Sequence, residues 1–125
     1  MLSLVAAVDA RIVGHIMYSP IVAGSVQGAA LGPMAVVPER QRQGIGTRLV
    51  ESGNEHLRHD GCPFVAVLGH PTFYPRFGFK PARTYGITCE WDVADDVFMV
   101  LVLDESKMAG AVGTAKYRTE FSTMA

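Results

Sequence analysis

The sequence predicts a single α+β domain built on one mixed sheet. Apolar segments with strand character are spread along the chain, and one strongly amphipathic helix separates the early ones from the late ones. The 125 residues are enough for one domain with a modest core and too few for two. No internal repeat or low-complexity linker interrupts them. We therefore expect residues 1–125 to form one folded unit.

The chain is predicted to begin with a β-hairpin. Leu2 to Ala7 and Arg11 to Tyr18 are rich in Val, Ile and Ala, and Asp9-Ala10 lies between them as the expected turn. The next segment, Pro20 to Gly28, contains the residues that punctuate chains and is predicted to be a turn.

A third strand and the main helix follow. The strand is expected from about Ala29 to Val37, with a bulge or a sheet edge at Gly32-Pro33 because proline removes a ladder donor. Pro38 to Gly46 is polar and glycine-bearing, which predicts a loop. An amphipathic helix of about three turns is predicted behind it, ending at His59-Asp60-Gly61. Its apolar positions recur at a spacing of four: Ile45, Leu49, Gly53 and Leu57.

The second half of the chain is predicted to alternate strands with short helical turns. Phe64 to Leu68 is a continuous apolar run, typical of a strand buried on both faces. Thr72 to Phe77 is expected to make one or two helical turns before Gly78. Val97 to Leu103 predicts a late strand, and a closing strand near Gly113 to Tyr117 is expected before a loose tail.

Composition excludes several classes of function. The formal net charge is −1 and the basic residues are scattered, so no basic block could follow a nucleic-acid backbone. The apolar start MLSLVAAV is short, has no basic region and is followed at once by Asp9 and Arg11, which argues against a signal peptide. No apolar run approaches the ~20 residues of a membrane span. We expect a cytoplasmic protein without nucleic-acid or membrane partners.

The two cysteines, Cys62 and Cys89, occur without a CxxC motif or metal-ligand spacing, so no metal is expected. They could form one disulfide or remain as two reduced thiols. The second interpretation agrees better with a cytoplasmic protein.

One segment, LGPMAVVPERQRQGIGTRLV from Leu31 to Val50, carries most of the functional information. A strand leads into a loop with Gln41, Gly44 and Gly46, and the loop opens directly into the helix. The first N–H groups of a helix have no partners within it, and the helix dipole there favours an anion. Because glycine has no β-carbon, the two glycines would let a diphosphate approach those amides. The segment therefore predicts a phosphate-binding loop.

Three kinds of phosphate loop can be compared with this one. A Walker A loop needs GxxxxGK[ST], but neither glycine here precedes Lys-Ser or Lys-Thr, so an NTPase is not expected. A dinucleotide fingerprint needs GxGxxG, and Leu49 stands where its third glycine belongs. The remaining pattern, [Q/R]-x-x-G-x-[G/A], is met by Gln41, Gly44 and Gly46. A glycine-bearing connection that binds no ligand stays as the alternative.

The segment resembles motif A of the GNAT (Gcn5-related N-acetyltransferase) superfamily. A second segment, VLGHPTFYPRFGFKPA from Val67 to Ala82, is similar to the family's motif B, with Tyr74, Gly78 and Phe79 in its Tyr-x-x-x-Gly-Phe positions. FMVLVLDESKMAGAVGTAKY, from Phe98 to Tyr117, resembles the end of the YhbS-like branch. The resemblance implies an α+β fold of the acyl-CoA N-acyltransferase type: a mixed, mostly antiparallel sheet with splayed central strands and flanking helices.

The resemblance also implies a function, which is transfer of an acetyl or other acyl group from acetyl-CoA to the amine of a small molecule or a peptide. In the family, the pantetheine arm of the cofactor lies between the splayed strands, where it would contact the backbone of Met34, Ala35 and Val36. The diphosphate would bind the loop amides, which are those of Gln41, Arg42, Gln43, Gly44, Ile45, Gly46 and Thr47. The Arg42 side chain is interpreted either as a further contact to a CoA phosphate or as a solvated loop arginine.

The implied chemistry needs a donor for the developing oxyanion, an acid for the departing thiolate and a base for the amine. A main-chain N–H near Met34 to Val36 would be the oxyanion donor. Tyr74 is the predicted general acid, and the alternative is that it only packs against the cofactor. His70 lies at the expected end of the central strand, and histidine is a common general base in enzymes. The other interpretation is a turn histidine without chemistry, with water taking the proton.

The chain departs from the family's pattern at its start. Full members begin with a strand and one or two helices ahead of the hairpin, and those helices form one wall of the acceptor pocket. We expect an upstream start, a shortened variant or a partner subunit that supplies the wall. The hypotheses are an active N-acyltransferase, a non-catalytic acyl-CoA-binding module, or a structural domain with an empty loop. An unshielded hairpin strand also predicts a homodimer that covers it.

Overall fold

The computed structural model of the chain describes residues 2–94 and 96–117. In this part of the chain the strands are β1 (Leu2–Val8), β2 (Arg11–Ala23), β3 (Val26–Val36), β4 (Phe64–Leu68), β5 (Lys80–Pro81), β6 (Ile87–Cys89), β7 (Phe98–Val102) and β8 (Gly113–Tyr117). The helices are the 3₁₀ helix η1 (Pro38–Arg40), the α-helix α1 (Ile45–His59) and the 3₁₀ helices η2 (Tyr74–Phe77), η3 (Ala82–Tyr85) and η4 (Glu105–Lys107). The tail expected after β8 lies outside the described residues.

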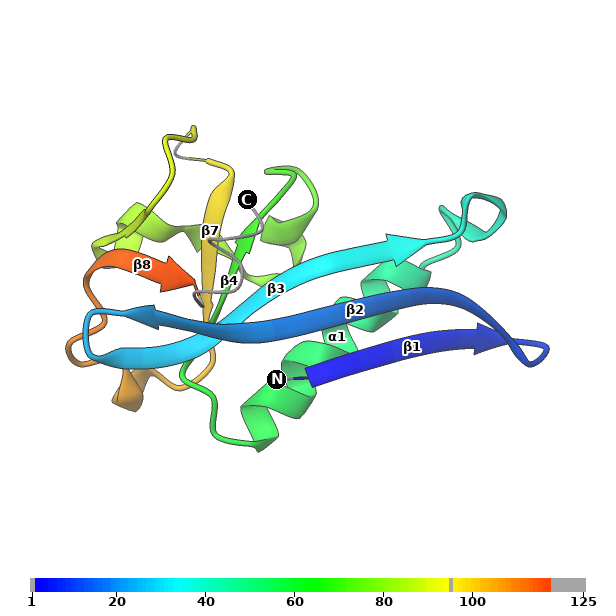
Figure 1. Ribbon diagram of the computed structural model, residues 1–125, viewed down its shortest axis with the longest axis horizontal. Helices are drawn as coiled ribbons and strands as arrows, with labels where there is room; N and C mark the ends of the chain where they lie inside the picture. Colours follow the sequence, from blue (N-terminus) through cyan, green and yellow to red (C-terminus); the bar gives the residue numbers. More distant parts are fainter. Residues whose placement is uncertain (1, 95, 118–125) are drawn as a thin grey trace.

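The strands form one mixed sheet, hydrogen-bonded in the order β5-β7-β4-β3-β2-β8-β6, with β1 paired to β2. Two strand pairs, β3 with β4 and β6 with β8, are parallel, and the other pairs are antiparallel. The long strands β1, β2 and β3 extend from the body of the molecule as an arm, and α1 lies along one face of it (Figure 1). The predicted mixed, mostly antiparallel α+β fold is confirmed.

The predicted hairpin is confirmed, and its second strand is longer than the sequence suggested. Asp9 and Ala10 form the turn with φ values of 51° and 65°, the left-handed conformations that suit a two-residue hairpin turn. The prediction of a turn from Pro20 to Gly28 was wrong, because β2 continues to Ala23 and only Gly24 and Ser25 turn.

Tertiary contacts explain why turn-forming residues are tolerated inside these strands. Along one edge of β2, the pairing with β1 ends at Tyr18 and the pairing with β8 begins at Ile21. Pro20 lies between these two positions, so no described strand flanks it on that side. A missing N–H is acceptable at such a place. Gly28 leaves room for β4, because a β-carbon there would lie 2.6 Å from the Phe64 carbonyl oxygen.

Helix α1 packs on the sheet through a contact between Tyr18 and Gly53. The Tyr18 ring is fully buried, and its hydroxyl donates a 3.0 Å hydrogen bond to the Asn54 side-chain oxygen. A β-carbon on Gly53 would lie within 2.7 Å of the Tyr18 Cζ atom. The glycine at this position of the apolar stripe therefore sets how closely α1 approaches β2.

Gly53→Ala is expected to lower the free energy of unfolding although alanine favours helix. The clash with Tyr18 should cost about 1–3 kcal/mol, against a gain of about 1 kcal/mol in helix propensity. Gly46→Ala is the matched control in the same helix, since its β-carbon would find no atom nearer than Met34 Cε at 3.9 Å. Thermal unfolding measures both. Equal melting temperatures for the two variants would contradict the packing described.

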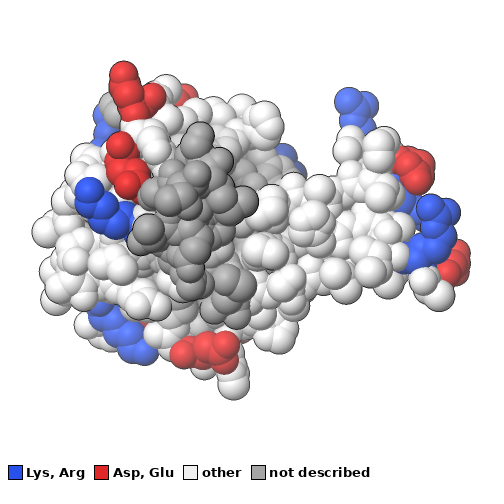
Figure 2. Space-filling view, in the orientation of Figure 1, with Lys and Arg blue, Asp and Glu red and all other residues white. Residues whose placement is uncertain are grey.

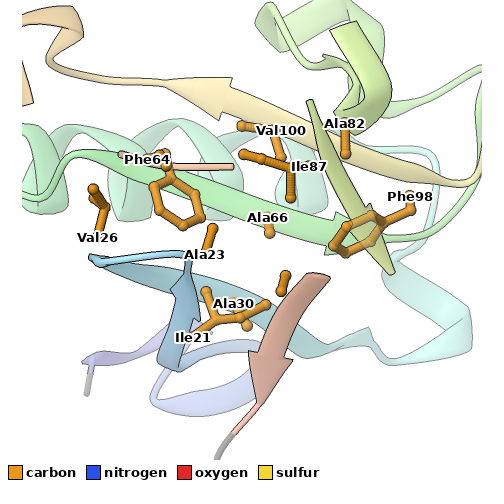
Figure 3. Close-up of a cluster of buried hydrophobic side chains, with 12 residues drawn as sticks. Ile21, Ala23, Val26, Ala30, Phe64, Ala66, Ala82, Ile87, Phe98 and Val100 are labelled. Carbon is orange, nitrogen blue, oxygen red and sulfur yellow. The ribbon is translucent and has the colours of Figure 1, made fainter. Parts of the chain in front are cut away.

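Buried side chains form two cores, one on each face of the sheet. One lies between α1 and the sheet and includes Ile16, Leu49 and Val65. The other lies on the opposite face, where Phe64, Ala66 and Val100 of the central strands meet side chains from η3, β6 and β8 (Figure 3). The central strand β4 contributes to both cores, as its continuous apolar run predicted.

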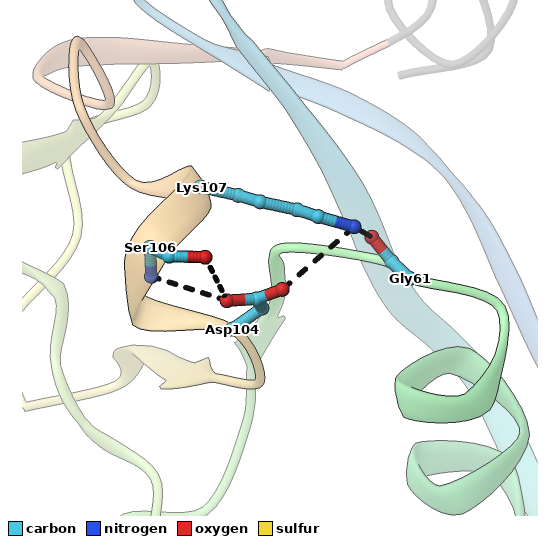
Figure 4. A network of polar contacts seen from close by, with 4 residues as sticks. All are labelled: Gly61, Asp104, Ser106 and Lys107. Atoms are coloured by element: carbon cyan, nitrogen blue, oxygen red, sulfur yellow. Dashed lines mark hydrogen bonds and ion pairs between the residues drawn. The ribbon is translucent and has the colours of Figure 1, made fainter.

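The segment after β7 holds the C-terminal end of α1 in place (Figure 4). Lys107 donates a 2.8 Å hydrogen bond to the Gly61 carbonyl oxygen and lies 3.7 Å from the Asp104 carboxylate. Asp104 also accepts hydrogen bonds from the Ser106 amide and hydroxyl, and these bonds lower the pKa of its carboxyl. This network therefore positions the C-terminal end of α1, and the loop between β3 and α1 positions its N-terminal end.

Candidate functional site

The two central strands, β3 and β4, part halfway along β3. They pair only from Ala29 to Leu31, opposite Val65 to Val67. At the next residues, Gly32 and Pro33 of β3 together face the single residue Met17 of β2, because the pairing with β2 shifts by one between Leu31 and Met34. The bulge predicted at Gly32-Pro33 is confirmed, and it coincides with the place where the central strands separate.

Beyond the bulge, β3 directs some of its backbone groups into the gap. The Val37 amide donates to the Val13 carbonyl oxygen at 2.8 Å, so the alternation of an antiparallel ladder also makes His15 and Ala35 a hydrogen-bonded pair. The same alternation turns the N–H and C=O groups of Met34 and Val36 away from β2, toward the gap. Of the three strand residues proposed from the sequence, Ala35 therefore has its backbone groups occupied by β2.

The side chains of the loop between β3 and α1 stabilise the loop itself. Gln41 donates through Nε2 to the Val36 carbonyl oxygen at 3.0 Å, and Gln43 donates through Nε2 to the Glu39 carbonyl oxygen at 3.3 Å. Arg42 has a φ of 65° and is exposed. The helix begins at Ile45, so the last two residues of the predicted loop, Ile45 and Gly46, belong to α1.

The N-terminal end of α1 is prepared for an anion. Gly44 is the N-cap residue, with a φ of 80°, and makes no side-chain capping bond because it has no side chain. The first turn of α1 contains no acidic residue, while His56, Arg58 and His59 lie in the last turn. The first amides of α1, at Ile45, Gly46 and Thr47, therefore combine free donors with the positive end of the helix dipole.

The facing wall of the gap comes from η2 and the end of β4. Tyr74 is only 7% exposed, and its ring lies against the Gly69 backbone, where a β-carbon would be 3.0 Å from the ring atom Cδ2. Burial raises the pKa of the Tyr74 hydroxyl. Phe73 and Phe79 pack edge-to-face against this ring at centroid distances of 5.0 and 5.6 Å. His70, at the start of the wall, is exposed.

Together these walls enclose an open cleft with a volume of about 1030 Å³, large enough for an extended cofactor. Its lining residues are Met34, Ala35, Val36, Arg40, Gln41, Arg42, Gly44, Ile45, Gly46, Thr47, His70, Thr72, Phe73, Tyr74 and Arg76. Of the residues proposed from the sequence, Gln43 alone does not line it. Four further residues line the cleft although the sequence did not mark them as site residues: Arg40, Thr72, Phe73 and Arg76. For Arg40 and Arg76, the signal available was their position inside the two motif segments.

Other features of the described residues bear on the class of site. Cys62 and Cys89 are both free and belong to different cores, so they form no disulfide with each other. No group of three or more His, Cys, Asp or Glu side chains in the described chain could hold a metal ion. Within the same residues, no helix is long and apolar enough to cross a membrane.

Comparison with known proteins identifies the family. Residues 2–81 match the family model described as an acetyltransferase (GNAT) domain. The chain belongs to the GNAT family.

The relatives agree with that membership. Over 124 residues, the chain is 32% identical to the uncharacterized N-acetyltransferase YhbS of Escherichia coli, covering 97% of this chain and 74% of the relative. It is 45% identical to the uncharacterized N-acetyltransferase YjhQ of the same organism over 84 residues, which is 64% of this chain. That alignment spans only 46% of YjhQ, so the chain matches less than half the length of this relative.

Solved GNAT structures share the fold. The crystal structure of YhbS from E. coli in complex with CoA superposes with a TM-score of 0.89 at 31% identity, covering 96% of this chain and 68% of that one. A GNAT acetyltransferase from Brucella melitensis in complex with acetyl-CoA gives a TM-score of 0.75 at 33% identity, covering 95% of this chain and 67% of that one. These similarities confirm the GNAT fold for nearly the whole of the present chain.

Proposed function

We propose that this chain binds acetyl-CoA in the cleft between β3 and η2 and transfers its acetyl group to a primary amine of a small molecule or a peptide. The observation that carries the proposal is the gap in the sheet, which backbone groups of Met34 and Val36 face. The N-terminal end of α1, whose amides can bind an anion, lines the same cleft. The complexes of two structural relatives with CoA and acetyl-CoA support it.

The cofactor would bind mainly through the protein backbone. Its pantetheine arm carries amide groups, which can pair with the N–H and C=O groups of Met34 and with the N–H of Val36 as an added strand would. The diphosphate would accept hydrogen bonds from the first amides of α1, where Gly44 and Gly46 leave the approach open. Gln41 donates a hydrogen bond to the Val36 carbonyl oxygen and so ties the loop to the end of β3. This bond would keep the diphosphate site and the pantetheine site at a fixed separation, so that one extended CoA molecule can occupy both.

The transfer itself would proceed by direct attack of the amine on the thioester carbonyl. A C–N bond forms, the carbonyl oxygen becomes negative, and the C–S bond then breaks to release the CoA thiolate. Pro33 has no N–H, so the Met34 amide is the first donor beyond the bulge that can stabilise the oxyanion. The Tyr74 hydroxyl would donate a proton to the departing thiolate, and the amine's own proton must pass to a base.

The attacking amine must lose a proton to a base. An alkylamine has a reference pKa near ~10.4 and is mostly protonated at neutral pH. His70 lines the cleft and is exposed, so it could accept that proton directly or through water. No Asp or Glu is among the residues that line the cleft.

A free-thiol assay tests the proposed transfer. The chain is incubated with acetyl-CoA and a panel of amines that includes small amines, amino acids and peptides, and the release of CoA thiol is followed. We expect release that depends on one class of amine and on enzyme concentration. Binding of acetyl-CoA without thiol release for every amine would favour the second candidate function, a non-catalytic acyl-CoA-binding module.

We also propose that residues 1–125 act as one domain in the cytoplasm, and that two copies associate through β1. The outer edge of β1 has no partner strand among the described residues, and Val5 and Ile12 are 57% and 65% exposed. Figure 2 shows few charged side chains over the strands of the arm, with charges gathered near its tip. Such an edge can pair with its copy across a two-fold axis.

Light scattering across a dilution series tests the association. We expect a dimer that Val5→Lys dissociates, because a charged side chain on an edge strand opposes pairing. Val112→Lys is the matched control, since Val112 is 58% exposed but lies away from β1. A parent chain that stays monomeric at micromolar concentration would contradict the proposed dimer.

A further inference from the structure

The cleft carries three arginine side chains, and none of them has a carboxylate partner in the described part of the chain. They are Arg40, Arg42 and Arg76. Two cations elsewhere in that part lie beside carboxylates: Arg58 Nη1 is 2.8 Å from Glu55 Oε2, and Lys107 Nζ is 3.7 Å from Asp104 Oδ2. Because the cleft lining contains no Asp or Glu, its arginines remain available to a bound anion.

Arg76 differs from the other two arginines in where it lies. Arg40 and Arg42 belong to η1 and the loop before α1, on the same wall as the amides proposed for the diphosphate. Arg76 belongs to η2, on the facing wall. A ligand held by the loop therefore presents a different part of itself to Arg76.

The Arg76 guanidinium is held over the ring of Phe73. Its Cζ atom lies 4.9 Å from the centroid of the Phe73 ring, and Phe73 is itself braced by edge contacts to Tyr74 and Phe77 at 5.0 and 5.2 Å. A guanidinium held over an aromatic ring by cation–π attraction still has N–H groups available for a second partner. Those groups form a planar fork that matches two oxygens of one phosphate.

We propose that Arg76 binds the 3′-phosphate on the ribose of CoA, and that this contact makes the site select CoA over dephospho-CoA. The inference rests on the proposed binding of acetyl-CoA in this cleft. Coenzyme A carries three phosphates: two form the diphosphate, which the α1 amides and the loop arginines serve, and the third is on the ribose. Arg76, the arginine on the opposite wall, is available to bind this 3′-phosphate.

Calorimetry with CoA and with dephospho-CoA tests the assignment on three proteins. The parent is expected to bind CoA about tenfold more tightly, as a charge-assisted bidentate contact would give. Arg76→Met keeps an unbranched side chain against Phe73 but removes the charge, so CoA affinity should fall about tenfold and dephospho-CoA affinity should stay. Arg48→Met is the matched control, because Arg48 is an exposed α1 residue outside the cleft lining; it should keep the preference.

The outcomes separate this inference from the proposed function. Equal binding of both ligands by the parent, or a preference that survives in Arg76→Met, would overturn the inference and leave the cofactor site standing. An equal loss of both ligands in folded Arg76→Met would also overturn it, since Arg76 would then contact a part common to both. A fourth protein, Arg42→Met, compares the two walls: if the preference for CoA is lost in Arg42→Met and kept in Arg76→Met, the inference is overturned, because the 3′-phosphate then binds the loop wall. A parent that binds neither ligand would contradict the proposed function together with the inference.

Discussion

Gly44→Val is expected to abolish acetyl-CoA binding while the domain remains folded. Gly44 lines the cleft at the start of α1, and no protein atom lies within 4 Å of the position that a β-carbon would take. The valine side chain would therefore meet no part of the protein but would occupy the space through which a phosphate approaches the helix amides. Calorimetry with acetyl-CoA measures the loss, and circular dichroism shows whether the fold is retained.

The backbone strain in that variant needs its own control, because Gly44 has a φ of 80° and a branched residue there is strained. Gly113 has a φ of 91°, also has no atom within 4 Å of a β-carbon position, and lies at the start of β8. Gly113→Val should show the same strain, a loss of about 1–2 kcal/mol in the free energy of unfolding, but should bind acetyl-CoA normally. Equal affinities for folded Gly44→Val and Gly113→Val would show that the loop does not hold the phosphates.

Tyr74→Phe is expected to lower kcat by about a hundredfold while changing the affinity for acetyl-CoA little. General acid catalysis contributes about 10²–10⁴, and this case belongs at the low end. A phenol with a reference pKa of ~10 is already a weaker acid than a thiol at ~8.5, and burial raises the pKa of Tyr74 further. The same shift keeps the hydroxyl protonated, so Tyr74 can act as a donor at every pH near neutrality.

Comparing kcat with the dissociation constant separates catalysis from packing for this residue. Tyr85→Phe is the control, since Tyr85 packs against the core on the opposite face of the sheet and its loss of a hydroxyl should change neither quantity. If Tyr74→Phe weakens acetyl-CoA binding but leaves kcat unchanged, Tyr74 serves to pack the cofactor.

Local patterns were sufficient to predict much of the fold and one wall of the site. The spacing of Leu49, Gly53 and Leu57 predicted α1, and Gly32-Pro33 predicted the bulge, because helix periodicity and a missing donor are properties of the segment itself. The glycines at 44 and 46 predicted a loop that opens into α1, and its binding of phosphate stays a prediction. The structure places this loop against the gap that begins at the bulge.

Features that depend on distant partners could not be predicted in this way. Pro20 and Gly28 suggested a turn, but Pro20 lies between the positions where β1 and β8 pair with β2, and Gly28 leaves room for Phe64. The backbone of Ala35 is directed by its register with His15. Arg76 lines the cleft because η2 lies opposite the loop. The spacing of residues in the sequence does not predict that arrangement.

The most direct test of the whole account is a calorimetric titration of the chain with acetyl-CoA. We predict one binding site per chain with a dissociation constant between about 1 μM and 1 mM, the usual range for enzyme substrates. The Gly44→Val variant should give no binding heat under the same conditions, and Gly113→Val should match the parent. A folded parent chain that gives no binding heat with millimolar acetyl-CoA would contradict the claim that this cleft is a cofactor site.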